Sequence, residues 1–137
     1  MKSDTKLINS GRDKKWTQGG VNPVIQRAST MIFDNVAEMK HATRNRMNDT
    51  LFYGRRGTTT NFAFSKAMTD LEGGAGCALY PCGTAAITSA LLSFLKHGDH
   101  LLMVDNTYEP TRGFCDSILK NMGITTTYYD PMIGEGI

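Results

Sequence analysis

Apolar residues recur along the second half of the chain with two distinct spacings. After Asn61 they recur every three or four positions, which predicts an amphipathic helix that ends at Gly73-Gly74. The apolar face of this helix consists of Phe64, Ala67, Met68 and Leu71. Short apolar or β-branched runs at 77–80, 100–104 and 124–129 predict three strands.

A helical pattern follows each of the first two predicted strands. An alanine- and leucine-rich segment begins after Pro81-Cys82 and ends at Gly98. A second helix begins at Pro110, a favoured first helical residue, and ends at Gly123. The elements therefore alternate between helix and strand, which is typical of an α/β domain with a parallel sheet and right-handed crossovers.

The N-terminal part of the chain has a weaker pattern. Residues 1–20 are polar and show little periodicity, so we expect an arm that lies on another surface and builds no core of its own. Pro23 and the β-branched residues beside it predict an extended segment over 21–33. Asp34 is expected to cap a short helix that runs to Ala42.

Composition narrows the class of protein. The chain has 137 residues, of which 40% are hydrophobic and 20% charged, as in an ordinary globular domain. A net charge of +2 is too small to indicate nucleic-acid binding, and no apolar run is long enough to cross a membrane. The three cysteines, Cys77, Cys82 and Cys115, lack a metal-binding spacing and indicate reduced thiols in a cytoplasmic protein.

The turn at Gly83-Thr84 is the first candidate site, because it joins a predicted strand to the start of a helix. Helix starts offer unpaired backbone N–H groups to an anion such as phosphate, and glycine allows close approach. Ligands of parallel sheets collect at the carboxyl ends of the strands, where Tyr108 is also expected. The alternatives are a plain connection at Gly83-Thr84 and a packing role for Tyr108.

A basic segment at 41–60 is the second candidate. Arg55 and Arg56 lie between Gly54 and Gly57, after the aromatic pair Phe52-Tyr53, whose rings we expect to be buried. Guanidinium groups on such a turn suit a phosphate or a carboxylate. The alternative is a solvated basic loop.

Four motifs resemble, in order and spacing, the N-terminal third of the cystathionine-metabolising, pyridoxal-phosphate-dependent enzymes. They are Tyr53-Gly-Arg-Arg-Gly57, Leu71-Glu-Gly-Gly-Ala-Gly76, Pro81-Cys-Gly-Thr-Ala-Ala86 and Asn106-Thr-Tyr-Glu-Pro110. The resemblance covers essentially the whole chain. The synthases and γ-lyases tend to carry Tyr-Ser-Arg or Tyr-Thr-Arg followed by Asn-Pro-Thr, whereas this chain continues from its arginine pair into Thr58-Thr59-Thr60, which favours the β-lyase branch.

The resemblance implies an α/β fold: residues 1–57 as an N-terminal arm, and 58–137 as the first βαβαβ part of a fold-type I (aspartate aminotransferase-like) domain. That domain has a largely parallel sheet with helices on both faces. The implied cofactor is pyridoxal 5'-phosphate. The amides of Gly83 and Thr84 would hold its phosphate, and Tyr108 would stack on its ring. Tyr53 and Arg55 would reach the phosphate of a neighbouring subunit's cofactor, and Arg56 would bind a substrate carboxylate.

The implied reaction is β-elimination of L-cystathionine to homocysteine, pyruvate and ammonia, a step of methionine biosynthesis. The resemblance also implies a cytoplasmic homo-oligomer, a homotetramer, without nucleic-acid or membrane partners. We expect the Schiff-base lysine to lie beyond Ile137, so the chain is expected to be an N-terminal fragment, inactive alone. The alternatives are a γ-synthase or γ-lyase of the same family and a noncatalytic truncated module.

Overall fold

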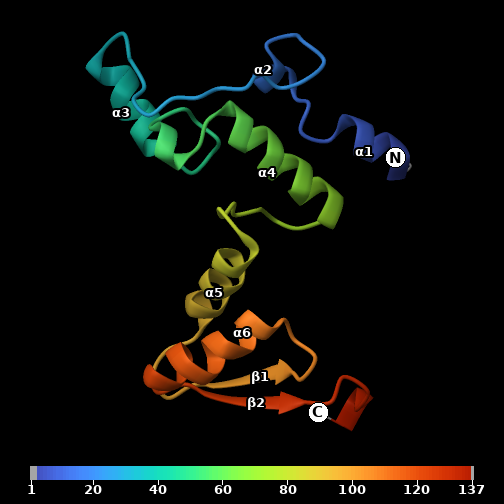
Figure 1. The fold of residues 1–137 in the computed structure, drawn as a ribbon. Helices are drawn as coiled ribbons and strands as arrows, with labels where there is room; N and C mark the ends of the chain where they lie inside the picture. The colour runs from blue at the N-terminus through green and yellow to red at the C-terminus, as the bar shows by residue number, and fades with distance from the viewer. Residues whose placement is uncertain (1–2, 137) are drawn as a thin grey trace. The chain divides into compact units, whose positions relative to one another are not determined.

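The computed structural model describes residues 3–136, which form two compact units that divide between Leu79 and Tyr80. Figure 1 shows the elements of both. The first unit contains α1 (Ser3–Asn9), α2 (Lys14–Thr17), α3 (Val36–Arg44), the 3-10 turn η1 (Gly54–Arg56) and α4 (Thr59–Glu72). The second contains α5 (Gly83–Phe94), β1 (His100–Val104), α6 (Glu109–Phe114), the π-helical turn η2 (Cys115–Leu119), β2 (Thr125–Tyr129) and the 3-10 turn η3 (Gly134–Gly136).

The first unit has a small core that contains a residue from the N-terminal arm. Trp16, at 2% exposure, packs with Phe62 and Ala63 of α4, and Leu51 lies against them. Both α1 and α2 contact α4. The helices α1 and α2 therefore lie on α4 of the same chain, and the sequence pattern gave no sign that Trp16 is a core residue.

The two longer helices of this unit begin with side-chain caps. The amide of Thr58 donates to Asn61 Oδ1 at 3.0 Å, and Gly73, with φ of 71°, ends α4 as predicted. The predicted cap of α3 at Asp34 is wrong by one residue. Asn35 is in the extended conformation and accepts from the Glu38 amide at 2.9 Å, while the Asp34 amide donates to Glu38 Oε2. Together the two bonds stabilise the helix start.

The second unit is a parallel pair of strands packed against a helix. β1 pairs with β2 in the register His100 to Thr125 through Val104 to Tyr129. Cys115, Leu119 and Ile124 are fully buried, and Leu101 and Met103 of β1 pack against them. Leu102, which alternates with these two along the strand, is half exposed. The α/β class expected from the sequence is thus present.

The first predicted strand, 77–80, is not formed. Among residues 3–136 the sheet has two strands, and 77–80 pairs with neither. A strand requires a neighbouring strand for its backbone hydrogen bonds, and here Cys77 O instead accepts from Ser65 Oγ of α4 at 2.8 Å. The segment is a connection, so the predicted alternation begins at α5.

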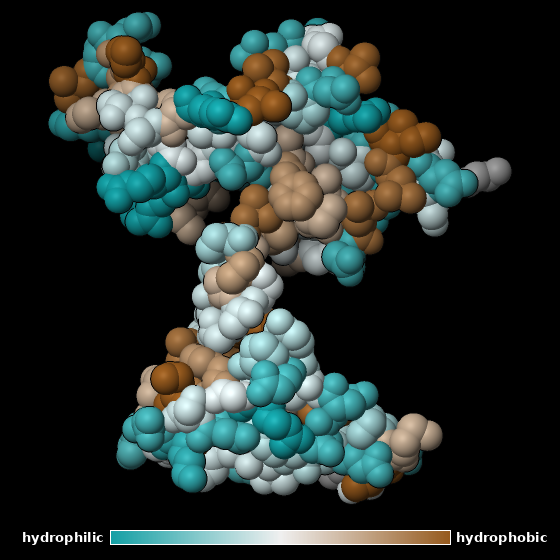
Figure 2. Space-filling view, viewed as in Figure 1, coloured by the Kyte–Doolittle hydropathy of each residue, from teal (hydrophilic) through white to brown (hydrophobic). Residues whose placement is uncertain are grey.

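Much of the molecule's apolar surface remains exposed in this chain. Figure 2 shows brown apolar groups among teal polar ones over the elements of the first unit. The exposed apolar residues there include Leu7, Ile8, Val21, Ile25 and Ile32. No helix within residues 3–136 has the length and hydropathy needed to span a bilayer.

Candidate functional site

The start of α5 offers free backbone amides to solvent. Cys82 is the N-cap: its carbonyl accepts from the Ala86 amide at 3.1 Å and its thiol from the Ala85 amide at 3.5 Å. In the described part of the chain, no hydrogen-bond acceptor lies opposite the amides of Gly83 and Thr84, and both residues are exposed. A 12-residue helix therefore presents two unpaired N–H groups at the positive end of its dipole.

Gly83 keeps this approach open. A Cβ atom built on Gly83 would meet no other atom within 4 Å, so the space around this residue is open. An anion can come into contact with the backbone only where that space is empty. The residues present thus fit a phosphate group, and that they bind the cofactor phosphate stays a prediction.

Tyr108 is positioned by the start of the next helix. It is the N-cap of α6, and its carbonyl accepts from the amides of Thr111 and Arg112 at 2.9 and 3.2 Å. The residue is 62% exposed, so Tyr108 is not a packing residue of this unit. α5 and α6 contact each other, which places both candidate positions on touching helices. That both face one ligand stays a prediction.

The arginine pair lies on a tightly held turn in the first unit. Arg55 Nε donates to the hydroxyl of Tyr53 at 2.8 Å, and its guanidinium lies 4.8 Å from the centre of the Tyr53 ring. Phe52 and Tyr53 are both half-buried, less than expected for this aromatic pair. Tyr53 pairs with Thr30 in an antiparallel bridge, and the Gly54 amide donates to Ser29 O at 2.6 Å. A Cβ on Gly54 would lie 1.7 Å from Ala28 O, so only glycine fits.

Gln26 forms hydrogen bonds to the threonines that follow this turn, and the sequence did not predict this role. Its side-chain oxygen accepts from the amide and hydroxyl of Thr59 at 3.1 and 2.9 Å. Its backbone carbonyl accepts from Thr58 Oγ1 at 3.1 Å, and its amide donates to Thr60 Oγ1 at 2.7 Å. The threonine run 58–60 was the one visible signal, because it supplies all three hydroxyls.

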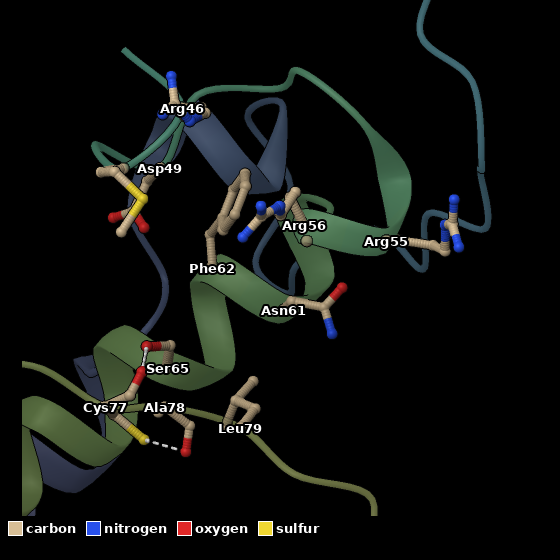
Figure 3. A pocket seen from close by; sticks show the side chains of 12 residues that line it. Arg46, Asp49, Arg55, Arg56, Asn61, Phe62, Ser65, Cys77, Ala78 and Leu79 are labelled. Carbon is tan, nitrogen blue, oxygen red and sulfur yellow. Dashed lines mark hydrogen bonds between the residues drawn. The ribbon is translucent and has the colours of Figure 1, made fainter. Parts of the chain in front are cut away.

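A pocket of about 360 Å³ opens beside the turn (Figure 3). Arg55 and Arg56 both line this pocket; in Figure 3 the Arg56 side chain lies next to Phe62, whereas that of Arg55 points away from it. The two guanidinium groups therefore do not converge on one anion in this structure, which suits separate ligands for the two. Arg46 and Asp49 also line the pocket, and the basic run at 41–60 was their only signal in the sequence.

One lysine near the first core is unsuited to nucleophilic chemistry. Lys66 Nζ lies 2.5 Å from Asp70 Oδ1, one helical turn away on α4. The hydrogen bond to Asp70 raises the pKa of Lys66 above its usual value, against a smaller lowering by burial. The pair with Asp70 thus favours the charged form of Lys66, which is the non-nucleophilic form of an amine.

The fold is of the α/β class, and the start of α5 fits the phosphate of a cofactor. Comparison with known proteins identifies the family of the chain. Residues 4–137 match the family described as "Cys/Met metabolism PLP-dependent enzyme", and the chain belongs to it. This confirms the resemblance stated from the motifs and the pyridoxal phosphate dependence that it implied. The assignments of individual residues to the cofactor stay predictions.

Curated relatives agree with the branch expected from the arginine turn. The chain is 57% identical over 136 residues to cystathionine beta-lyase MetC of Escherichia coli (strain K12), covering 99% of this chain and 34% of the relative. It is 58% identical over 134 residues to a cystathionine beta-lyase of Salmonella typhimurium, with 98% and 34% covered. The chain thus spans about a third of the length of these relatives.

Solved structures share the fold. A cystathionine gamma-lyase from Lactobacillus plantarum, crystallised with L-serine, matches with a TM-score of 0.78 and 29% identity over 95% of this chain and 31% of that one. The structure of metB from Corynebacterium glutamicum matches with a TM-score of 0.83 over 99% of this chain and 33% of that one. At 23% identity the second likeness concerns the fold alone.

Proposed function

We propose that this chain forms part of the cofactor site of a pyridoxal-phosphate-dependent carbon-sulfur lyase. The proposed reaction is β-elimination of L-cystathionine to homocysteine, pyruvate and ammonia, a step of methionine biosynthesis. Identities of 57% and 58% to enzymes named cystathionine beta-lyase support this choice of reaction. The structural observation that carries it is the open helix start with the free amides of Gly83 and Thr84.

Each candidate residue has a proposed task. The amides of Gly83 and Thr84 bind the cofactor phosphate, and Tyr108 stacks on the pyridine ring. Arg56 binds a carboxylate of the substrate from its place beside the pocket. When bound, pyridoxal phosphate supplies the electron sink that carbon-sulfur bond cleavage needs. None of the lysines in this chain is proposed to bond to the cofactor, and Lys66 is engaged in an ion pair with Asp70.

The site is proposed to be shared between subunits of a cytoplasmic homo-oligomer, a homotetramer. Tyr53 and Arg55 reach the cofactor phosphate of a neighbouring subunit, and residues 1–57 act as the arm that carries them there. The exposure of Arg55 and the exposed apolar residues of the arm support this assignment, because both surfaces can be covered on assembly.

The reaction is tested by product analysis on the intact protein that carries this chain. With pyridoxal phosphate and cystathionine, pyruvate and homocysteine are expected, and Arg56→Ala should raise KM about tenfold or more through loss of a charge-assisted contact. Arg44→Ala, an exposed arginine on α3, is the matched control. Formation of 2-oxobutyrate or of a new thioether would assign a γ-lyase or γ-synthase, and cofactor binding without any product would assign a noncatalytic module.

Subunit sharing is tested by mixing variants. Arg55→Ala impairs the half-site given to the neighbour, and Tyr108→Ala impairs the half-site of the subunit's own cofactor. If the site is shared, mixed oligomers contain some sites with neither substitution and regain activity. Mixtures that stay as inactive as the two parents would contradict sharing without touching the assignment of the reaction.

A further inference from the structure

Arg112 connects the two ends of the segment that carries Tyr108. Its backbone amide donates to the Tyr108 carbonyl at 3.2 Å, at the start of α6. Its side chain reaches back to the end of β1, where Nη2 donates to the Asp105 carbonyl at 3.0 Å and pairs with the Asp105 carboxylate. One residue therefore holds both the first and the last position of the connection 105–108.

The guanidinium group of Arg112 is itself supported by β2. It lies over the Tyr128 ring, 3.7 Å from the ring centre, an arrangement that favours a cation. The Tyr128 hydroxyl donates to Asp116 Oδ1 at 2.7 Å, which holds the ring against η2. The Asp105 amide also donates to Tyr129 O at 2.8 Å, so the connection is tied to the sheet as well.

The exposure of the Asp105–Arg112 pair and its position both indicate a role other than stabilising the packing of this unit. Asp105 and Arg112 are both substantially exposed, with side-chain exposures of 59% and 34%, so the pair buries little surface. An exposed pair of this kind contributes little to folding stability. Its geometric effect is specific, because it sets the path of the backbone that leads to an exposed aromatic ring.

We propose that Arg112 is a positioning residue that orients Tyr108 for stacking on the cofactor ring, with Asp105 as its partner. This rests on the proposed function, since it takes Tyr108 as the stacking residue. Arg112 touches neither cofactor nor substrate and acts through the backbone of the connection. Loss of its side chain frees the connection, and the ring then occupies several orientations.

The test is a double-mutant cycle on the intact protein, read as the dissociation constant of pyridoxal phosphate and the circular dichroism of the bound cofactor. Arg112→Gln should weaken binding about five- to tenfold, from one lost charge-assisted contact, and reduce the dichroism. In a Tyr108→Ala background the same substitution should have no further effect, because no ring remains to be positioned. Arg112→Lys should recover part of the affinity, and Arg44→Gln serves as the control.

The outcomes separate this inference from the function on which it rests. An equal loss from Arg112→Gln in both backgrounds, or no loss in either, would overturn the positioning role while leaving cofactor binding intact. If Tyr108→Ala itself leaves affinity unchanged, the stacking role fails and the inference fails with it. If Arg112→Gln does not fold, Asp105→Asn in the same two backgrounds decides, with the same loss expected only where Tyr108 is present.

Discussion

Arg55 and Tyr53 form a pair across a 3-10 turn, with the Arg55 Nε donating to the Tyr53 hydroxyl at 2.8 Å and the guanidinium 4.8 Å from the ring centre. The bond uses one of the five N–H donors of the guanidinium and leaves the others for an anion. Tyr53 is in turn anchored by its bridge to Thr30. The turn thus holds an arginine in one orientation before any ligand arrives.

The bond between Arg55 and Tyr53 predicts what happens when the Tyr53 hydroxyl is removed. Tyr53→Phe keeps the ring and removes the acceptor of the Arg55 bond, so Arg55 should lose its orientation. We expect pyridoxal phosphate to bind the intact protein about five- to tenfold more weakly, with little change in thermal stability. Tyr129→Phe, a tyrosine of β2, is the control. An unchanged affinity in Tyr53→Phe would show that the hydroxyl does not position Arg55 for the cofactor.

Gly83 allows the ligand site to be separated from folding. A methyl group at Gly83 meets no atom within 4 Å, so Gly83→Ala should leave stability unchanged or raise it by about 0.5 to 1 kcal/mol, since alanine favours a helix. The same methyl group should obstruct the phosphate and weaken cofactor binding by about tenfold or more. Thermal unfolding and cofactor titration measure the two effects. Cofactor binding at full affinity would place the phosphate elsewhere.

Gly54 should behave in the opposite way. Its Cβ would lie 1.7 Å from Ala28 O, so Gly54→Ala forces the turn away from the 24–30 segment and should destabilise the first unit by about 3 kcal/mol. Gly76→Ala, where a Cβ meets nothing within 4 Å, should have little effect. Urea unfolding of the two variants side by side tests this. Equal stabilities would mean that the close approach of the two backbones is absent.

Tyr128 should ionise at a higher pH than an ordinary tyrosine. Burial, together with the hydrogen bond to Asp116, raises the pKa of Tyr128 from 10.0 to about 12. The folded state favours the neutral phenol, so this stabilisation is complete below pH 10 and is lost as the pH rises towards 12. Absorbance titration should show one tyrosine ionising last, and Tyr128→Phe should remove that step. A last step that survives in Tyr128→Phe would contradict the assignment.

The fluorescence of Trp16 can show whether the N-terminal segment lies on α4. It is the one tryptophan of the chain and is 2% exposed against Phe62 and Ala63. Trp16→Ala should cost about 3 to 5 kcal/mol, and Trp16→Phe less. The fluorescence of the unsubstituted chain should be blue-shifted and protected from iodide. Emission typical of water-exposed tryptophan would mean that the N-terminal segment does not lie on α4.

The elements that the sequence predicted well are those determined by local signals. The helical character of α4, its end at Gly73 and the runs that form β1 and β2 all depend on residues close in the chain. The predicted apolar face of α4 was only partly right, because Phe64 is exposed whereas Phe62 and Ala63 are buried. The strand at 77–80 failed because apolar composition does not reveal whether a strand has a neighbour. The cap of α3 moved from Asp34 to Asn35 because both residue types can cap, and only the backbone conformation decides.

The residues of the candidate site also divide into those with a local signal in the sequence and those without one. Gly83, Thr84 and the arginine turn were found because their motifs are contiguous. Gln26, which lies more than 30 residues from the threonines it binds, gave no signal of its own. The contact of Arg112 with Tyr128, 16 residues further on, likewise depends on the pairing of β1 with β2. Long-range contacts of this kind follow from the fold and cannot be read from spacing.

The most direct test of the central claim is a crystal structure of the intact protein with pyridoxal phosphate. We expect phosphate oxygens about 2.7 to 3.2 Å from the amide nitrogens of Gly83 and Thr84, at the start of α5, with the Tyr108 ring against the pyridine. A phosphate bound away from α5, with these two amides facing solvent, would contradict the account.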